Sequence, residues 1–292
     1  MTLRIPLAIS TCPNDTFAFH GILTGKVRTR GIEFDVSLMD IDELNRGLFA
    51  GRFGVAKASF HAALLLSDHM VVLPAGSALG FGVGPVLLAS RHLDLESLPR
   101  DELKGLHILS PGEQTTAHLL WRLFHQGHGW VTHVTFSDIM PSLQRSEADL
   151  GICIHEGRFT YEQAGLVQIE DLGKTWEEST GAPLPLGGIL ARRDLGADTL
   201  DRVSRLLGDS ILYGLENRDE TVETMARYAQ DMDEEVMFGH VDLYVNEWTH
   251  DLGVTGRMAL AALAEHARRS GLVPGGVQLL EVYAPEAEIS VE

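Results

Sequence analysis

The sequence predicts an α/β protein with two lobes, a ligand-binding cleft between them and a helical C-terminal region. Segments of strand length alternate with segments of helix length over the first ninety residues, and the alternation begins again near residue 106. Glycine-bearing strands near residues 85–90 and 187–192 enclose the second run, which suggests that the chain crosses twice between lobes. We therefore expect a large lobe from residues 1–89 plus 190–292 and a small lobe from residues 90–189.

The first run contains apolar segments typical of strands and amphipathic segments typical of helices. Residues 32–38 alternate apolar and polar side chains with a period of two, as a half-buried strand does. Asn14, Asp15 and Thr16 form a helix start before Phe17. The expected strands are 3–10, 32–38, 54–58 and 86–89, and the expected helices are 14–23, 40–50 and 60–66.

The second run has the same order and is followed by an irregular stretch after Glu170. Its expected strands are 106–109, 133–136, 150–154 and 186–192, and its expected helices are 115–125 and 139–146. From Asp198 to Gly271 the pattern is almost entirely helical, with helix starts at Asp198, Asp219 and Thr255. We expect this helical region to return to the large lobe.

Composition excludes several classes of partner. The chain has 292 residues, and 23 Lys+Arg against 41 Asp+Glu give a formal net charge of −18, which argues against nucleic acid because phosphates are bound mainly by Lys and Arg. Cys12 and Cys153 have no metal-ligand spacing, and we expect no metal site. No apolar run approaches the roughly 18 residues of a membrane span, so no membrane partner is expected. The N-terminal segment lacks a signal-peptide pattern, so we expect a cytoplasmic protein.

Polar residues gather where predicted strands end and helices begin, which is the edge that faces a cleft in α/β proteins. The polar candidate binding residues at these junctions are Asn14, Lys57, Ser59, Thr115 and Thr116. Free backbone amides at a helix N-terminus favour an anion, and Lys57 would add positive charge. Asn14 and Ser59 would serve equally well as ordinary helix caps. The loop at 110–114 is not a P-loop, because no Gly-Lys-Ser/Thr follows it at the required spacing.

A histidine at the end of a predicted strand is the candidate catalytic group. His155 follows the apolar strand 150–154, so it would face the cleft and could act as a general base near neutral pH. The alternative is that His155 is structural, as most of the 13 histidines must be. A cysteine nucleophile is a further alternative, with Cys12 in the pocket-forming loop and His155 as its partner. Cys153 lies inside an apolar strand and is expected to be a small core residue.

Four segments of the sequence are distinctive. They are Ser-Thr-Cys-Pro-Asn-Asp-Thr-Phe at 10–17, Lys-Ala-Ser-Phe-His-Ala at 57–62, Gly-Glu-Gln-Thr-Thr-Ala at 112–117 and Ile-His-Glu-Gly-Arg-Phe-Thr-Tyr at 154–161. Together these segments resemble the 1,4-dihydroxy-6-naphthoate synthase family of the futalosine route to menaquinone. The similarity extends over nearly the whole chain, including Leu186–Ile189 and Tyr244–Asn246, while Thr11 stands where the family pattern has proline.

The resemblance implies a fold like the type II periplasmic binding proteins and a cofactor-free, lyase-type cleavage of cyclic dehypoxanthine futalosine. His155 would be the proton acceptor, and the small-molecule substrate would lie against residues 57–59, Thr115, Thr116 and Ala117. Two rival functions remain: a chorismate dehydratase-like enzyme of the same pathway, and a binding protein that only captures a small anion. The sequence leaves the oligomeric state and the roles of Asp15, Glu156 and Arg158 open.

Overall fold

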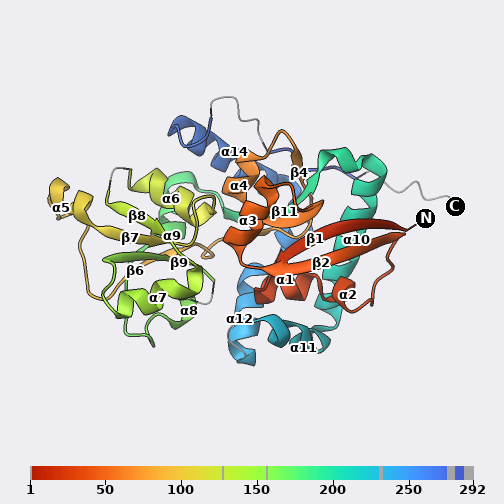
Figure 1. Cartoon of the computed structure of the whole chain (residues 1–292), viewed down its shortest axis with the longest axis horizontal. Helices are drawn as coiled ribbons and strands as arrows, with labels where there is room; N and C mark the ends of the chain where they lie inside the picture. Colours follow the sequence, from red (N-terminus) through yellow and green to blue (C-terminus); the bar gives the residue numbers. More distant parts are fainter. Residues whose placement is uncertain (1, 127, 156, 230–232, 275–279, 286–292) are drawn as a thin grey trace.

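A computed structural model describes residues 2–126, 128–155, 157–229, 233–274 and 280–285, and it contains two β-sheets with helices packed around each (Figure 1). The first sheet is formed by β1 (Leu3–Ser10), β2 (Ile32–Met39), β3 (Val55–Ser59), β4 (Met70–Val72), β5 (Ala78–Gly80) and β11 (Leu184–Arg192). The second is formed by β6 (Val86–Ala89), β7 (His107–Ser110), β8 (Trp130–His133), β9 (Leu150–Cys153) and β10 (Val167–Asp171).

In the first sheet the strand order is β2-β1-β3-β11-β4, and β5 pairs with β11 as well. The strands β1, β2 and β3 run parallel, so the ends of β1 and β3 carry Ser10 and Ser59 to the same edge. β11 enters antiparallel to β3 and pairs Gly187 with Ser59. A segment from late in the chain is thereby placed beside the end of β3.

In the second sheet the order is β10-β6-β9-β7-β8. β7 runs parallel to β8 and β9, whereas β6 is antiparallel to β9 and β10 is antiparallel to β6. The strands β6 and β9 are fully buried, which explains their continuous apolar sequences.

The strand β11 begins at Leu184, before the lobe boundary expected at residue 190, and its pairing partners all lie in the first sheet. The lobe boundaries themselves remain a prediction.

Helices cover both sheets, and the C-terminal ones pack on the N-terminal ones. The helices in the described residues are α1 (Pro13–Ala18), α2 (His20–Leu23), α3 (Ile41–Phe49), α4 (Phe60–Leu65), α5 (Arg100–Gly105), α6 (Thr116–Phe124), α7 (Phe136–Gln144), α8 (Gly157–Thr160), α9 (Leu172–Thr180), α10 (Ala197–Glu216), α11 (Arg218–Tyr228), α12 (Glu234–Tyr244), α13 (Glu247–His250) and α14 (Gly253–Arg269). α10 packs on α2, and α11 and α12 pack on α1. The Ser210 hydroxyl of α10 donates to the carbonyl of Ala18 in α1 at 2.7 Å and accepts from the backbone N–H of Ile22 in α2 at 3.2 Å.

Three sequence expectations differ from the structure. The helix expected at 14–23 is interrupted at Phe19, which has φ −95° and ψ 1°, and so forms α1 and α2. The strand expected at 133–136 lies earlier, as β8, and α7 already begins at Phe136. The stretch expected to be irregular after Glu170 contains α9, and β10, which ends at Asp171, was not expected. The Asp171 carboxylate caps α9 by accepting from two backbone amides, and Trp176 of α9 is fully buried.

Candidate functional site

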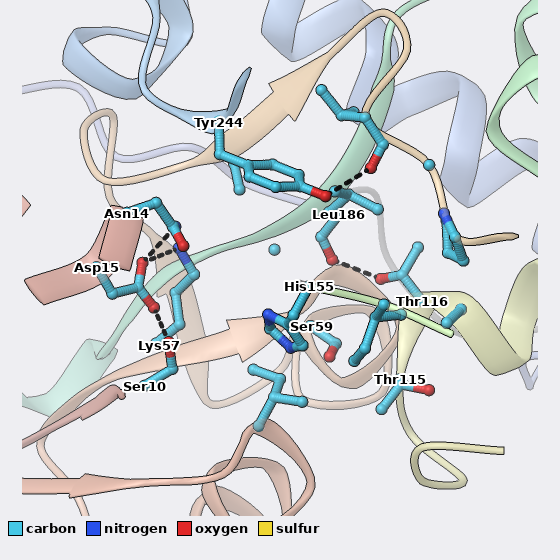
Figure 2. Close-up of a pocket in the computed structure, with 18 of the residues that line it drawn as sticks. Ser10, Asn14, Asp15, Lys57, Ser59, Thr115, Thr116, His155, Leu186 and Tyr244 are labelled. Atoms are coloured by element: carbon cyan, nitrogen blue, oxygen red, sulfur yellow. Dashed lines mark hydrogen bonds and ion pairs between the residues drawn. The ribbon is translucent and has the colours of Figure 1, made fainter. Parts of the chain in front are cut away.

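A pocket lies at the carboxyl ends of β1 and β3, where α6, the loop after β9 and α12 meet these strands (Figure 2). Its empty space, including the part open to solvent, is about 640 Å³. The sequence-predicted residues that line it are Asn14, Lys57, Ser59, Thr115, Thr116, Ala117 and His155. Ala58 is not among the lining residues, because it is fully buried within β3, where it pairs with Gly188.

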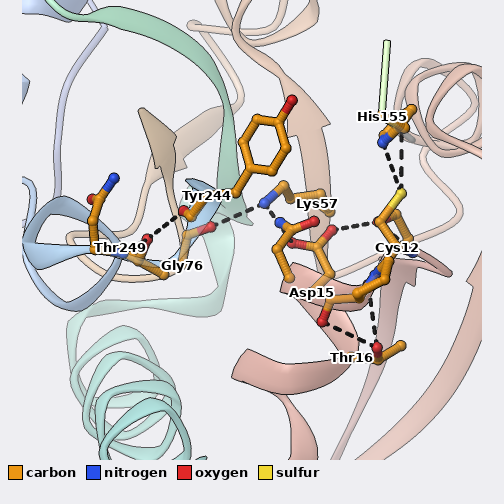
Figure 3. A network of polar contacts seen from close by, with 12 residues as sticks. Cys12, Asp15, Thr16, Lys57, Gly76, His155, Tyr244 and Thr249 are labelled. Atoms are coloured by element: carbon orange, nitrogen blue, oxygen red, sulfur yellow. Dashed lines mark hydrogen bonds and ion pairs between the residues drawn. The ribbon is translucent and has the colours of Figure 1, made fainter. Parts of the chain in front are cut away.

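Lys57 is held in a buried ion pair with Asp15. Its Nζ lies 2.6 Å from Asp15 Oδ1 and donates to the carbonyl of Gly76 at 3.1 Å (Figure 3). The same carboxylate accepts from the Ser10 hydroxyl at 2.6 Å and from the Asn14 amide at 3.0 Å. The electric fields of two opposite charges this close together nearly cancel for a ligand farther away in the pocket. Lys57 lines the pocket, and the positive charge that it was expected to add there is largely neutralised by Asp15.

Ser59 and Asn45 form a second buried contact beside the pocket. Asn45 donates its amide to the Ser59 hydroxyl at 3.1 Å, and its amide oxygen accepts from the Ser59 backbone N–H at 3.0 Å. Ser59 occupies the cap position of α4 but makes no side-chain cap hydrogen bond there. The structure therefore shows no capping bond from this side chain. Among the described residues its hydroxyl proton has no acceptor, so it can turn toward the pocket.

The two threonines at the start of α6 have their hydroxyls engaged within the protein. Thr115 Oγ1 caps the helix by accepting from His118 N at 3.2 Å, and it donates to the carbonyl of Gly112 at 2.7 Å. Thr116 Oγ1 donates to the carbonyl of Leu186 in β11 at 2.6 Å. The backbone N–H groups of Thr116 and Ala117 have no partner within the described part of the chain. These amides, rather than the hydroxyl protons, are what α6 can offer an anion.

His155 points into the pocket from the loop after β9 (Figure 2). Its Nδ1 lies 2.9 Å from the sulfur of Cys12, and its ring packs against Phe136 with centroids 4.8 Å apart. The backbone of His155 has φ +56°, a left-handed conformation that is uncommon for a residue with a side chain and is often found at functional sites. The same sulfur lies 3.9 Å from Nε2. If Nδ1 donates its N–H to the sulfur, Nε2 is the nitrogen that can take a proton from a ligand.

Arg158 fixes the segment that follows His155. Its guanidinium donates to the carbonyl of Gly84 at 2.8 Å and to the Asp171 carboxylate at 2.7 Å. It therefore has a structural contact, which the sequence could not assign, while Glu156 lies outside the described residues. Cys153 is buried in β9, where burial raises the pKa of its thiol, as expected for a core residue.

Sequence reasoning left Asp15 without a role and missed two aromatic residues of α12. His240 and Tyr244 line the pocket although they lie far along the chain from its other residues. The available signal was weak: Tyr244 begins a short segment included in the resemblance, but nothing in the local pattern marks His240. Within the described ranges, no three His, Cys, Asp or Glu side chains come together as a metal-ligand group, and no helix has the length and apolar character needed to span a membrane.

Comparison with known proteins now decides the family. A family model described as menaquinone biosynthesis matches residues 5–269. The chain belongs to this menaquinone biosynthesis family. A curated relative from Thermus thermophilus, named 1,4-dihydroxy-6-naphthoate synthase, is 40% identical over 266 residues, which cover 91% of this chain and 94% of the relative.

Solved structures place this family member in a wider fold class. A protein from Archaeoglobus fulgidus, 34% identical, superposes with a TM-score of 0.86 over 92% of this chain and 98% of that one. The periplasmic aliphatic sulphonate binding protein from Escherichia coli is only 13% identical, yet it gives a TM-score of 0.61 over 99% of this chain and 96% of its own. The expected periplasmic-binding-protein-like α/β fold with a helical C-terminal region is confirmed.

Proposed function

We propose that this protein is a cofactor-free lyase that converts cyclic dehypoxanthine futalosine to 1,4-dihydroxy-6-naphthoate, with His155 as the general base. The observation that carries the proposal is the placement of His155: its ring lies in the pocket and its Nδ1 is engaged by Cys12. The name of the Thermus thermophilus relative supports the product, because the two chains match over nearly their whole lengths.

The described residues suggest how this reaction would proceed. Nδ1–H donated to the Cys12 sulfur would leave Nε2 unprotonated, so that Nε2 can remove a proton from a carbon of the substrate before the skeleton fragments. General-base catalysis of this kind is typically worth about 10²–10⁴-fold in rate. The remaining acceleration would come from holding the substrate in one orientation inside a pocket that excludes water.

The aromatic carboxylate of the substrate would bind at the start of α6. The amides of Thr116 and Ala117 are available there, and the helix dipole favours a negative charge. Lys57 would contribute less than its formal charge implies, since Asp15 neutralises it. The attraction must therefore be local, because the whole chain carries a net charge of −18. We also propose that residues 1–89 with 190–292 and residues 90–189 form the two lobes, and that the protein is cytoplasmic.

The variant that tests the base is His155→Asn. Asn tolerates the left-handed backbone at this position better than Ala does, so the loop should keep its path while the base is lost. We expect product formation from cyclic dehypoxanthine futalosine to fall at least a hundredfold, with unchanged binding in calorimetry and an unchanged melting curve. Turnover near the wild-type rate would show that His155 is not the base. Binding without turnover by the wild-type protein would instead support the small-anion binding protein.

A further inference from the structure

The pocket contains a second histidine besides His155. His240 lies on α12, is only 1% exposed and yet lines the pocket. Both of its ring nitrogens are buried, and neither has a hydrogen-bond partner among the described residues. Buried polar groups in proteins are almost always hydrogen-bonded, because leaving one unsatisfied is costly. A ligand in the pocket would supply the partner that the protein does not.

The surroundings of His240 determine which form of its ring is present. The ring lies nearly parallel to that of His155, with centroids 6.2 Å apart and planes at 7°, and it packs against Tyr244 at 4.5 Å. Burial lowers the pKa of His240 well below its usual value. The ring is therefore a neutral imidazole with one N–H donor and one acceptor nitrogen.

A donor in this position complements the base. When His155 removes a proton from a substrate carbon next to a carbonyl group, the C–H electron pair forms a carbon–carbon double bond and the carbonyl π pair moves onto the carbonyl oxygen. The proton goes to His155, and nothing is oxidised or reduced. A fixed donor aimed at the oxygen that gains this charge stabilises the transition state more than the ground state. A neutral imidazole carries one N–H group, so it can donate a hydrogen bond to this oxygen.

We propose that His240 binds the substrate by donating a ring N–H to the oxygen that becomes negative when His155 accepts the proton. This inference deepens the proposed function and rests on it. A histidine buried only for packing would be replaced without loss of activity by phenylalanine, which has a similar flat ring and no polar atoms to bury. The proposal requires the opposite, because phenylalanine cannot donate the hydrogen bond.

The test compares His240→Phe and His240→Gln with a matched control. We expect kcat for cyclic dehypoxanthine futalosine to fall about a hundredfold in His240→Phe with a smaller change in KM, and His240→Gln to recover part of the loss because its amide can donate. His20→Phe is the control, because His20 is also buried, at 3% exposed, and stacks on Tyr213 away from the pocket. It should keep the wild-type kcat.

A kcat of His240→Phe within threefold of wild type, or an equal loss in His20→Phe, would overturn the role of His240 while leaving the proposed function intact. If His240→Phe does not fold, ¹⁵N-histidine NMR of the His155→Asn protein gives the answer, with the His240 signal assigned from the His240→Gln spectrum. Saturating substrate should move that ring resonance, and an unmoved resonance would contradict the proposal. Absence of turnover by the wild-type protein would overturn the proposed function and this role together.

Discussion

Replacing Asp15 by Asn is expected to destabilise the protein strongly, because it leaves a buried lysine without its counter-charge. Lys57 and Asp15 are separated by 2.6 Å, and their side chains are only 6% and 4% exposed. In Asp15→Asn, the lysine would keep the Gly76 carbonyl and a neutral amide oxygen as acceptors. Removing one partner of a buried pair typically costs about 3–5 kcal/mol. Since the amide can still accept a hydrogen bond, we expect about 3 kcal/mol.

The assay is urea unfolding at pH 7 of the wild type, Asp15→Asn, Lys57→Met and the double variant. The double variant should be more stable than the sum of the single losses predicts, because neither charge is then left alone. Glu147→Gln is the control: it breaks the ion pair of Arg145 with Glu147, whose side chains are 57% and 52% exposed, and should cost less than about 1 kcal/mol. A loss below about 1 kcal/mol in Asp15→Asn, or strictly additive losses, would refute the reasoning.

Two further predictions concern the cysteine beside the base and the stability in acid. Cys12→Ser should keep substantial activity, because a hydroxyl can also engage His155 Nδ1; complete loss of kcat would instead support the cysteine nucleophile. Burial lowers the pKa of His61 to about 4 and of His118 to about 3. Below pH 6.5 the unfolded chain therefore binds more protons than the folded protein, and the free energy of unfolding decreases as the pH is lowered. Between pH 6.5 and 5 the free energy of unfolding falls by about 2 kcal/mol for each of these histidines. In urea unfolding, the stability of His118→Gln should depend less on pH than that of the wild type. An unchanged pH dependence would show that His118 does not have a lowered pKa in the folded protein.

The sequence predicted the strands well where burial imposes a simple pattern. β1 and β6 have the expected bounds, and β2 ends one residue beyond its expected limit. Strands like these are predictable because a strand buried on both faces has a continuous apolar sequence and a half-buried strand alternates apolar and polar residues. The helix α9 was missed, since its Gly, Thr and Ser residues favour loops and its stability comes from the Asp171 cap and the buried Trp176. Tertiary packing, which no local pattern records, determined this element.

The candidate site was predicted in its location but not in its electrostatics. Strand ends and helix starts marked His155 and the residues around Lys57 and Thr116, because parallel strands bring such junctions to one edge. The pairing of Lys57 with Asp15 depends on how α1 is placed against β3, which the sequence does not show. His240 arrives from α12 through packing of α12 on α1, so only the folded chain shows that it reaches the pocket.

The most direct test of the account is chromatography of the purified protein incubated with cyclic dehypoxanthine futalosine. We predict that 1,4-dihydroxy-6-naphthoate accumulates with the wild-type protein, without any added cofactor, and that it stays at background with His155→Asn. Absence of the naphthoate from wild-type reactions, with a correctly folded protein and intact substrate, would contradict the proposed function.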